Sequence, residues 1–265
     1  MKLFTVGPVE MSEETRLIGA APLPYFRTED FSELMFETEL LLKKSIQTAE
    51  NSKVAILTAS GTGAMEAAVM NIFNKGDKLL VIDGGSFGHR FGQICESHGI
   101  PFESINLNFG EELGANHLEP FSDKGFSGML INIHETSTGQ LYDIDLVSTF
   151  CRENNLFLVV DAISSFLADS YDMDASGIDA TIISSQKGLA IPPGLSMIVV
   201  NERTYQKIIG NTPSTLYFRL KDYFSNMQRG QTPFTPAQGI VYQLNAQLKK
   251  VTKSGINTFI NRSAS

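Results

Sequence analysis

The stretch that most constrains the fold runs from Leu156 to Gly194 and contains two short apolar runs rich in β-branched residues. Leu156–Val160 and Ala180–Ile183 have the length and composition of strands that are buried on both faces of a sheet. Asp161 directly follows the first run, and Lys187 lies just beyond the second. Parallel strands would bring both residues to the sheet edge where open α/β sheets bind ligands, so we expect them to face one ligand.

An amine and a carboxylate at one ligand site are the pair that pyridoxal phosphate requires. The Lys amine forms a Schiff base, and the Asp holds the pyridinium nitrogen protonated so that the ring acts as an electron sink. Each residue alone is weak evidence, because strand-end Asp residues often cap helices and most Lys residues are solvated surface charges. The surrounding sequence therefore has to support the assignment.

That sequence reads DAISS from Asp161 and SSQKGLAIPPG around Lys187. It resembles the cofactor core of the class V aminotransferases, fold-type I pyridoxal phosphate enzymes that include alanine–glyoxylate, serine–pyruvate and 2-aminoethylphosphonate–pyruvate transaminases. The resemblance covers most of the chain from the segment LFTVGPVEM onward. It implies an aminotransferase that moves an amino group from a small amino acid or amine to a 2-oxo acid such as pyruvate or glyoxylate, through a Lys187 Schiff base.

A glycine-rich turn follows the apolar run Val54–Leu57 and opens a helix rich in Ala and Met. Glycines let backbone N–H groups approach a phosphate, and a helix N-terminus adds partial positive charge. The turn lacks the Lys-Ser/Thr pair of a Walker A loop and is not the GxGxxG of a dinucleotide fold, so by itself it is a weak signal. The family has a matching turn, and the resemblance assigns the cofactor phosphate to Ser60, Gly61, Thr62 and Gly63.

The resemblance assigns further cofactor contacts at the same edge. Phe87, in a GxFGxR-like segment, would stack on the pyridine ring, whereas general composition favours a place in the core. Thr136, in HETSTG, would hold the phenolic oxygen, although a hydroxyl there can also simply cap a turn. Glu135 is expected to orient neighbouring groups. Gln186 completes the phosphate site, and Ile163 is expected to contact the cofactor.

The remaining apolar runs complete an α/β alternation. Strands are predicted at 78–82, 102–106, 129–133 and 195–200, with the last one antiparallel as in the family, and helices at 28–50, 143–154, 201–210 and 238–253. Right-handed crossovers then give a mostly parallel seven-stranded sheet with helices on both faces, the large domain of the fold-type I enzymes.

Three regions are expected along the chain. Residues 1–25 are an N-terminal arm, residues 26–235 are the cofactor-binding large domain, and residues 236–265 are a linking helix and the start of a truncated small domain. The family's C-terminal small domain, which carries the Arg that clamps the substrate carboxylate, is apparently missing. The chain is then either naturally short or a fragment, and the activity of this shortened chain is left open.

Thr232 and Thr235 match family positions from which a second subunit reaches the first subunit's cofactor phosphate. The resemblance therefore implies a homodimer with shared active sites. The donor and acceptor stay undetermined. Another pyridoxal phosphate reaction such as a lyase, or a truncated non-catalytic binding or dimerisation module, remains an alternative.

The composition argues against nucleic acid, a metal ion and a membrane as binding partners. The chain has 265 residues and a formal charge of −8, and clusters of basic residues are missing, so nucleic acid is not expected. Cys95 and Cys151 have no metal-ligand spacing, so no metal site is expected, and two buried thiols in a reducing compartment are the simplest reading. Without a signal peptide or a run of about 20 apolar residues, we expect a cytoplasmic protein with no membrane partner.

Overall fold

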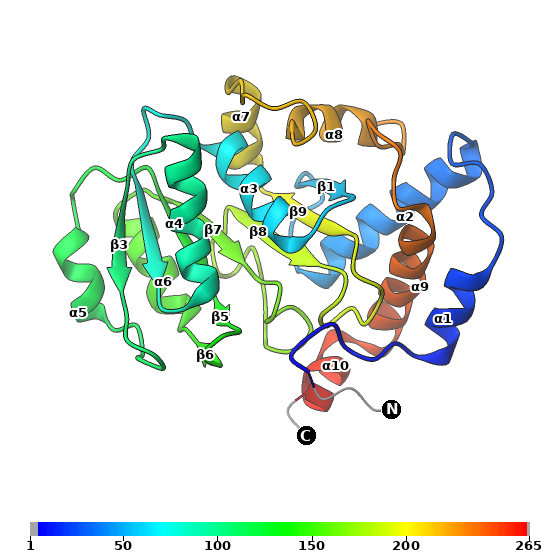
Figure 1. Cartoon of the computed structure of the whole chain (residues 1–265), viewed down its shortest axis with the longest axis horizontal. Coiled ribbons are helices and arrows are strands. Elements are labelled where there is room, and N and C mark those ends of the chain that lie inside the picture. Colours follow the sequence, from blue (N-terminus) through cyan, green and yellow to red (C-terminus); the bar gives the residue numbers. More distant parts are fainter. Residues whose placement is uncertain (1–4, 264–265) are drawn as a thin grey trace.

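A seven-stranded sheet runs through the centre of the computed structural model, which describes residues 5–263 (Figure 1). All neighbours pair in parallel except β9, which is antiparallel to both β1 and β8. In spatial order the strands are β1 (Lys53–Leu57), β9 (Ser196–Val200), β8 (Ala180–Ser184), β7 (Phe157–Asp161), β4 (Gly128–Asn132), β2 (Leu79–Asp83) and β3 (Phe102–Asn106). The predicted fold class and the antiparallel strand are confirmed.

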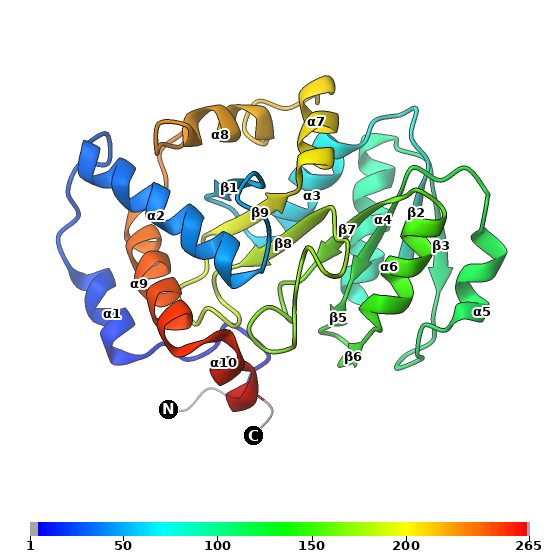
Figure 2. The ribbon, with the colours of Figure 1, turned by 180° about the vertical axis from the view of Figure 1, so that it is seen from behind.

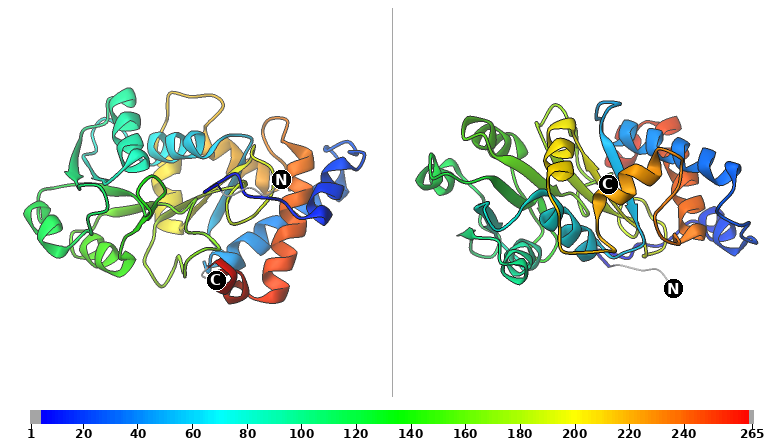
Figure 3. Two further views of the ribbon diagram at one scale, coloured as in Figure 1. Left: turned by 60° about the horizontal axis from the view of Figure 1, so that its bottom comes forward. Right: turned by 90° about the horizontal axis from the view of Figure 1, so that it is seen from above.

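Helices cover both faces of the sheet (Figure 3). One face carries α2 (Glu29–Ser45), α6 (Ile144–Glu153) and α9 (Gln238–Ser254), and the other carries α3 (Gly61–Ile72) and α4 (Ser86–His98), with α7 (Glu202–Gly210) and α8 (Leu220–Met227) beside α3. Successive side chains of a strand point to opposite faces. In β7, Leu158 and Val160 therefore join one core while Val159 joins the other, which is why these strands are apolar throughout.

Two helix boundaries depend on local backbone chemistry. Thr28 caps α2 by accepting a hydrogen bond from the Phe31 N–H, as its position predicted. The helix ends at Ser45 and not at the expected Glu50, because Gln47 adopts a left-handed conformation with φ 55°. Its side chain then donates to the Tyr171 carbonyl, which ties the end of α2 to the loop after β7.

The N-terminal region, predicted to be an arm over residues 1–25, includes a helix. It contains α1 (Glu13–Ala20), capped by Ser12 and tied to α9 by the Gln243 amide, which donates to the Thr15 carbonyl at 2.7 Å. Residues 1–4 lie outside the described part, and the arm proper is the short stretch before α1. Figures 1 and 2 show this stretch crossing the end of the molecule that also carries β5, β6 and α10.

The remaining elements are short. They are α5 (Ala115–Leu118), the 3₁₀ helix η1 (Glu119–Phe121), the paired strands β5 (His134–Glu135) and β6 (Gln140–Leu141), and α10 (Ile256–Ser263). Within residues 5–263, none of the helices has both the length and the apolar character needed to cross a bilayer.

Candidate active site

Two adjoining pockets open at the carboxyl edge of the sheet, an outer one of about 770 Å³ and a deeper one of about 160 Å³. Both are lined by Ser60, Phe87, Thr136, Gln186 and Lys187. The deeper pocket also reaches Gly61, Thr62, Asn132, Asp161 and Ile163. The structure thus brings most of the predicted site residues into one place, from strands and helix starts far apart in the sequence.

Asp161 is the last residue of β7 and is 1% exposed. Its Oδ1 accepts the Ile163 N–H at 2.9 Å, and its Oδ2 accepts the Asn132 amide at 2.8 Å. Burial raises the pKa of Asp161 to about 6, against these two hydrogen bonds, and the nearby Glu135 carboxylate raises it further. Such a carboxylate is suited to accept a cationic N–H group, because a cation relieves the unfavourable burial of its charge.

Lys187 lies in the tight loop after β8, which parallel pairing places beside β7. Its Nζ donates to the Val6 carbonyl of the arm at 2.9 Å, and the arm is held there by the Val9 N–H, which donates to the Gln186 carbonyl at 3.1 Å. Burial lowers the pKa of Lys187, while the Asp161 carboxylate opposes the shift. The amine and the carboxylate thus share one pocket, as the sequence predicted.

Asn132 was not expected at the site. It ends β4, pairs in register with Asp161, and its Oδ1 is buried without a hydrogen-bond partner among residues 5–263. Its position within an apolar run hid it, although a single amide at the end of a strand that neighbours β7 is the signal that could have found it. Asn132 lines the deeper pocket, so a ligand bound there could donate a hydrogen bond to the unpaired oxygen.

The glycine-rich turn builds the other end of the deeper pocket. Ser60 is the N-cap of α3, and its Oγ accepts the Gly63 N–H at 3.3 Å. A Cβ at Gly61 would lie 2.5 Å from Ile163 Cδ1, so a larger residue there would push the end of the Ile163 side chain aside. The start of α3, with its partial positive charge, therefore faces the pocket, as an anionic group would require. Gly63 supports the turn and does not line either pocket.

Phe87 and Thr136 line both pockets. Phe87 is in the first turn of α4 and is not among the fully buried core residues, which argues against its alternative place in the core. The Thr136 hydroxyl is 2.5 Å from the Ser164 hydroxyl, a neighbour that the sequence analysis did not include. A flat ring and a hydroxyl pair thus face one cavity.

Thr232 and Thr235 lie away from these pockets within the chain. Thr232 is 4% exposed, and its hydroxyl donates to the Phe234 carbonyl at 2.6 Å, while Thr235 is exposed. Their predicted contact concerns the cofactor of a second subunit, and it stays a prediction.

The residues present fit pyridoxal phosphate. The deeper pocket combines an amine, a buried carboxylate whose pKa is raised, an unpaired amide oxygen and the start of a helix. These groups match the aldehyde, ring nitrogen and phosphate of that cofactor.

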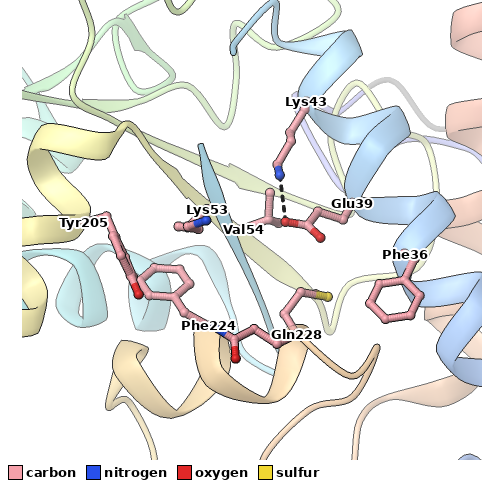
Figure 4. A pocket seen from close by; sticks show the side chains of 9 residues that line it. Phe36, Glu39, Lys43, Lys53, Val54, Tyr205, Phe224 and Gln228 are labelled. Atoms are coloured by element: carbon pink, nitrogen blue, oxygen red, sulfur yellow. Dashed lines mark ion pairs between the residues drawn. The ribbon is translucent and has the colours of Figure 1, made fainter. Parts of the chain in front are cut away.

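A separate pocket of about 220 Å³ lies between α2, β1, α7 and α8, and it contains none of the predicted site residues (Figure 4). Lys43 pairs with Glu39 at 2.8 Å, and Lys53 lies over the ring of Tyr205 at 5.4 Å. Both of its lysines therefore already have a partner.

The fold and the site define a pyridoxal phosphate enzyme of fold-type I. The aminotransferase class-V profile matches residues 25–264. The chain therefore belongs to the class V aminotransferase family, and it is a pyridoxal-phosphate-dependent transaminase by class.

Individual relatives match nearly the whole of this chain. The small subunit of soluble hydrogenase from Synechococcus sp. is 30% identical, over 98% of this chain and 68% of its own. L-aspartate–glyoxylate aminotransferase from Paracoccus denitrificans is 28% identical, over 98% and 67%. The structure of aspartate aminotransferase subgroup IV from Thermus thermophilus superposes with a TM-score of 0.91 at 30% identity, over 98% and 73%. The chain thus spans about two thirds of the length of these relatives.

Proposed function

We propose that the chain transfers an amino group from a small amino acid or amine to a 2-oxo acid such as pyruvate or glyoxylate, with Lys187 and Asp161 as its catalytic residues. The observation that carries this proposal is the pairing of a buried Asp161 with Lys187 in one pocket. The acceptor class is supported by the Paracoccus relative, whose name pairs L-aspartate with glyoxylate.

When bound, pyridoxal phosphate supplies an electron sink for the bonds of the substrate's α-carbon. Lys187 would hold the cofactor through Nζ. When it is not so engaged, the same Nζ would serve as the base that takes a proton from the substrate's α-carbon and as the acid that gives this proton back. Burial lowers the pKa of Lys187, which favours the neutral Nζ that this task needs.

Other side chains bind and orient. Asp161 keeps a proton at the ring nitrogen by offering its carboxylate to the N–H. Ser60, Gly61, Thr62 and Gln186 surround the phosphate, with Gly63 fixing the turn. Phe87, Thr136 and Ile163 line the deeper pocket. Phe87 would stack on the pyridine ring, Thr136 would hold the phenolic oxygen, and Ile163 would contact the cofactor. Val6, Gly7 and Pro8 of the arm line the outer pocket, and the Val6 carbonyl accepts from Nζ and so orients the amine.

Borohydride reduction tests the anchoring residue. The purified protein with added pyridoxal phosphate should become visibly yellow, and reduction followed by peptide mass mapping should place the adduct on Lys187. The Lys187→Arg variant serves as the control. It keeps the positive charge but cannot form a Schiff base, so borohydride has no bond to reduce at this position. An adduct on another lysine, or none, would overturn the proposal. Amino-group transfer from a panel of small amino acids to glyoxylate and pyruvate then identifies the substrates.

We also propose that the protein acts as a homodimer with shared sites and that residues 26–235 are the cofactor-binding unit. Exposed apolar side chains, including Tyr25, Leu216 and Tyr217, support the dimer. We place the protein in the cytoplasm, where Cys95 and Cys151, both buried and unbridged, stay reduced.

A further inference from the structure

The start of α4 is capped by side chains from a distant segment. The N-cap residue is Gly85, which has no side chain to accept the first N–H groups of the helix. The Ser86 N–H donates instead to Ser137 Oγ at 2.9 Å. The N–H groups of Phe87 and Gly88 donate to one oxygen of Glu135 at 3.1 and 3.0 Å. Both partner residues follow β4, about fifty positions further along the chain.

We call Glu135 and Ser137 the remote cap, and the two residues are also bonded to each other. The N–H and the hydroxyl of Ser137 donate to the other Glu135 oxygen, at 3.1 and 2.6 Å. Both carboxylate oxygens are thus used, which is what a buried charge needs in order to be stable. Glu135 is 1% exposed, and its negative charge lies at the positive end of α4.

The packing around the remote cap leaves no room for adjustment. A Cβ at Gly85 would lie 2.5 Å from Glu135 Cγ and 2.6 Å from Ser137 Oγ. The helix start and the capping segment are therefore in direct contact, and glycine is needed at the contact. A shift of the remote cap would move the first turn of α4.

Phe87 is in that first turn, and Thr136 is the residue between the two capping residues. Both line the cofactor pockets. One carboxylate thus fixes the distance between the aromatic ring on α4 and the hydroxyl on the segment after β4.

We propose that Glu135 is a positioning residue that sets pyridoxal phosphate affinity by holding the Phe87 ring against the cofactor. The inference rests on the proposed cofactor site, and it goes beyond it by assigning a role to a residue that contacts no cofactor atom. Glu135 has the same charge as Asp161, but it acts through the backbone of α4.

The first experiment uses the fact that the chain has no tryptophan. A Phe87→Trp variant carries a single fluorophore at the cofactor face, and its emission should be quenched when pyridoxal phosphate binds. Adding Glu135→Gln replaces one acceptor oxygen with a donor amide, so the first turn of α4 loses part of its cap. We expect weaker quenching at saturating cofactor, because the ring is no longer held against it. Unchanged quenching at saturation would overturn the proposal.

The second experiment is a double-mutant cycle on cofactor affinity, measured by titration of the visible absorbance. Glu135→Gln and Phe87→Ala should each raise the dissociation constant about fivefold, the size of one aromatic contact. In the Phe87→Ala background, Glu135→Gln should have little further effect, because it acts through the missing ring. Independent, multiplying effects would contradict a positioning role.

Two further variants separate positioning from loss of stability. Ser137→Ala removes one link of the remote cap, should fold even if Glu135→Gln does not, and should give a smaller change in the same direction. Asp143→Ala removes the cap of α6 away from the pockets, so it should lower thermal stability without changing cofactor affinity. Equal loss of affinity in Asp143→Ala would overturn the proposal. If Phe87→Ala itself leaves cofactor affinity unchanged, the result contradicts the proposed place of Phe87 in the cofactor site. That outcome is distinct from a failure of the positioning role of Glu135.

Discussion

Asp161 is the residue whose chemistry depends most on where it lies. A carboxylate at the end of an exposed strand would stay ionised with its ordinary pKa of 3.8, whereas burial raises the pKa of Asp161 to about 6. Without the cofactor, burying the charged Asp161 carboxylate lowers the stability of the fold. With the cofactor bound, the protonated ring nitrogen would lie beside the carboxylate and offset this cost.

The Asp161→Asn variant tests this opposition through the pH dependence of unfolding. Because the pKa of Asp161 is raised in the folded protein, its contribution to stability is full below about pH 4 and is lost as pH rises through 6. The variant has no such loss. Between pH 4 and pH 8, the free energy of unfolding of the cofactor-free variant should therefore rise relative to that of the wild type by on the order of 3 kcal/mol. Urea unfolding at both pH values measures the difference.

A second buried carboxylate provides the control for this prediction. Asp179 is buried, and burial raises its pKa as well, but it bonds to Leu158 and Asn201 away from the pockets. Asp179→Asn should leave cofactor affinity unchanged, whereas Asp161→Asn should weaken it strongly. A pH-independent difference between wild type and Asp161→Asn would show that the Asp161 carboxylate is not held as described.

At the scale of elements, the site is assembled from the ends of strands and the starts of helices. β7 and β8 deliver Asp161 and Lys187, while α3 and α4 begin at the same edge with Ser60 and Phe87. The parallel register makes this possible, because strand ends and the following helix starts then lie side by side.

Ser60 serves both the helix and the proposed phosphate site. Ser60→Ala removes the cap of α3 and should lower stability by about 1 kcal/mol and also weaken pyridoxal phosphate binding. The matched control is Asp143→Ala, which removes the cap of α6 at a similar cost without affecting cofactor affinity. Thermal unfolding and cofactor titration of the two variants measure both effects. Equal affinity in the two variants would remove Ser60 from the proposed site.

At the scale of the whole molecule, the two cores on either side of the sheet hold the strand ends in place. In the proposed homodimer, a second subunit would complete the site. Thr232 and Thr235 lie away from the chain's own pockets, so any contact with a cofactor has to come from a second subunit.

Subunit mixing tests whether the sites are shared. Lys187→Ala lacks the amine, and Thr235→Glu would place a negative charge against the partner's cofactor phosphate, so each variant alone should be inactive. After mixing, half of the molecules should be mixed dimers with one intact site each, which restores about a quarter of the sites. Sedimentation equilibrium should give twice the 29.1 kDa chain mass. A monomer, or no recovery on mixing, would contradict the shared-site proposal.

The antiparallel direction of the last strand was expected from the family resemblance. The amino-acid sequence by itself determined the α/β alternation and the pair Asp161 and Lys187. These features are local, because each depends on an apolar run of a few residues and on the polar residue that follows it. The glycine-rich turn at Ser60–Gly63 was visible for the same reason, since its backbone requirement is encoded in neighbouring residues.

Only the tertiary structure decided the features that join distant segments. Asn132 looked like part of an apolar strand until its register with Asp161 placed its amide at the pocket. The remote cap joins α4 to residues about fifty positions away, and α1 depends on packing against α9. Such contacts are set by how strands and helices pack, and no local pattern in the chain specifies them, because their energy comes from burial and hydrogen bonds between elements.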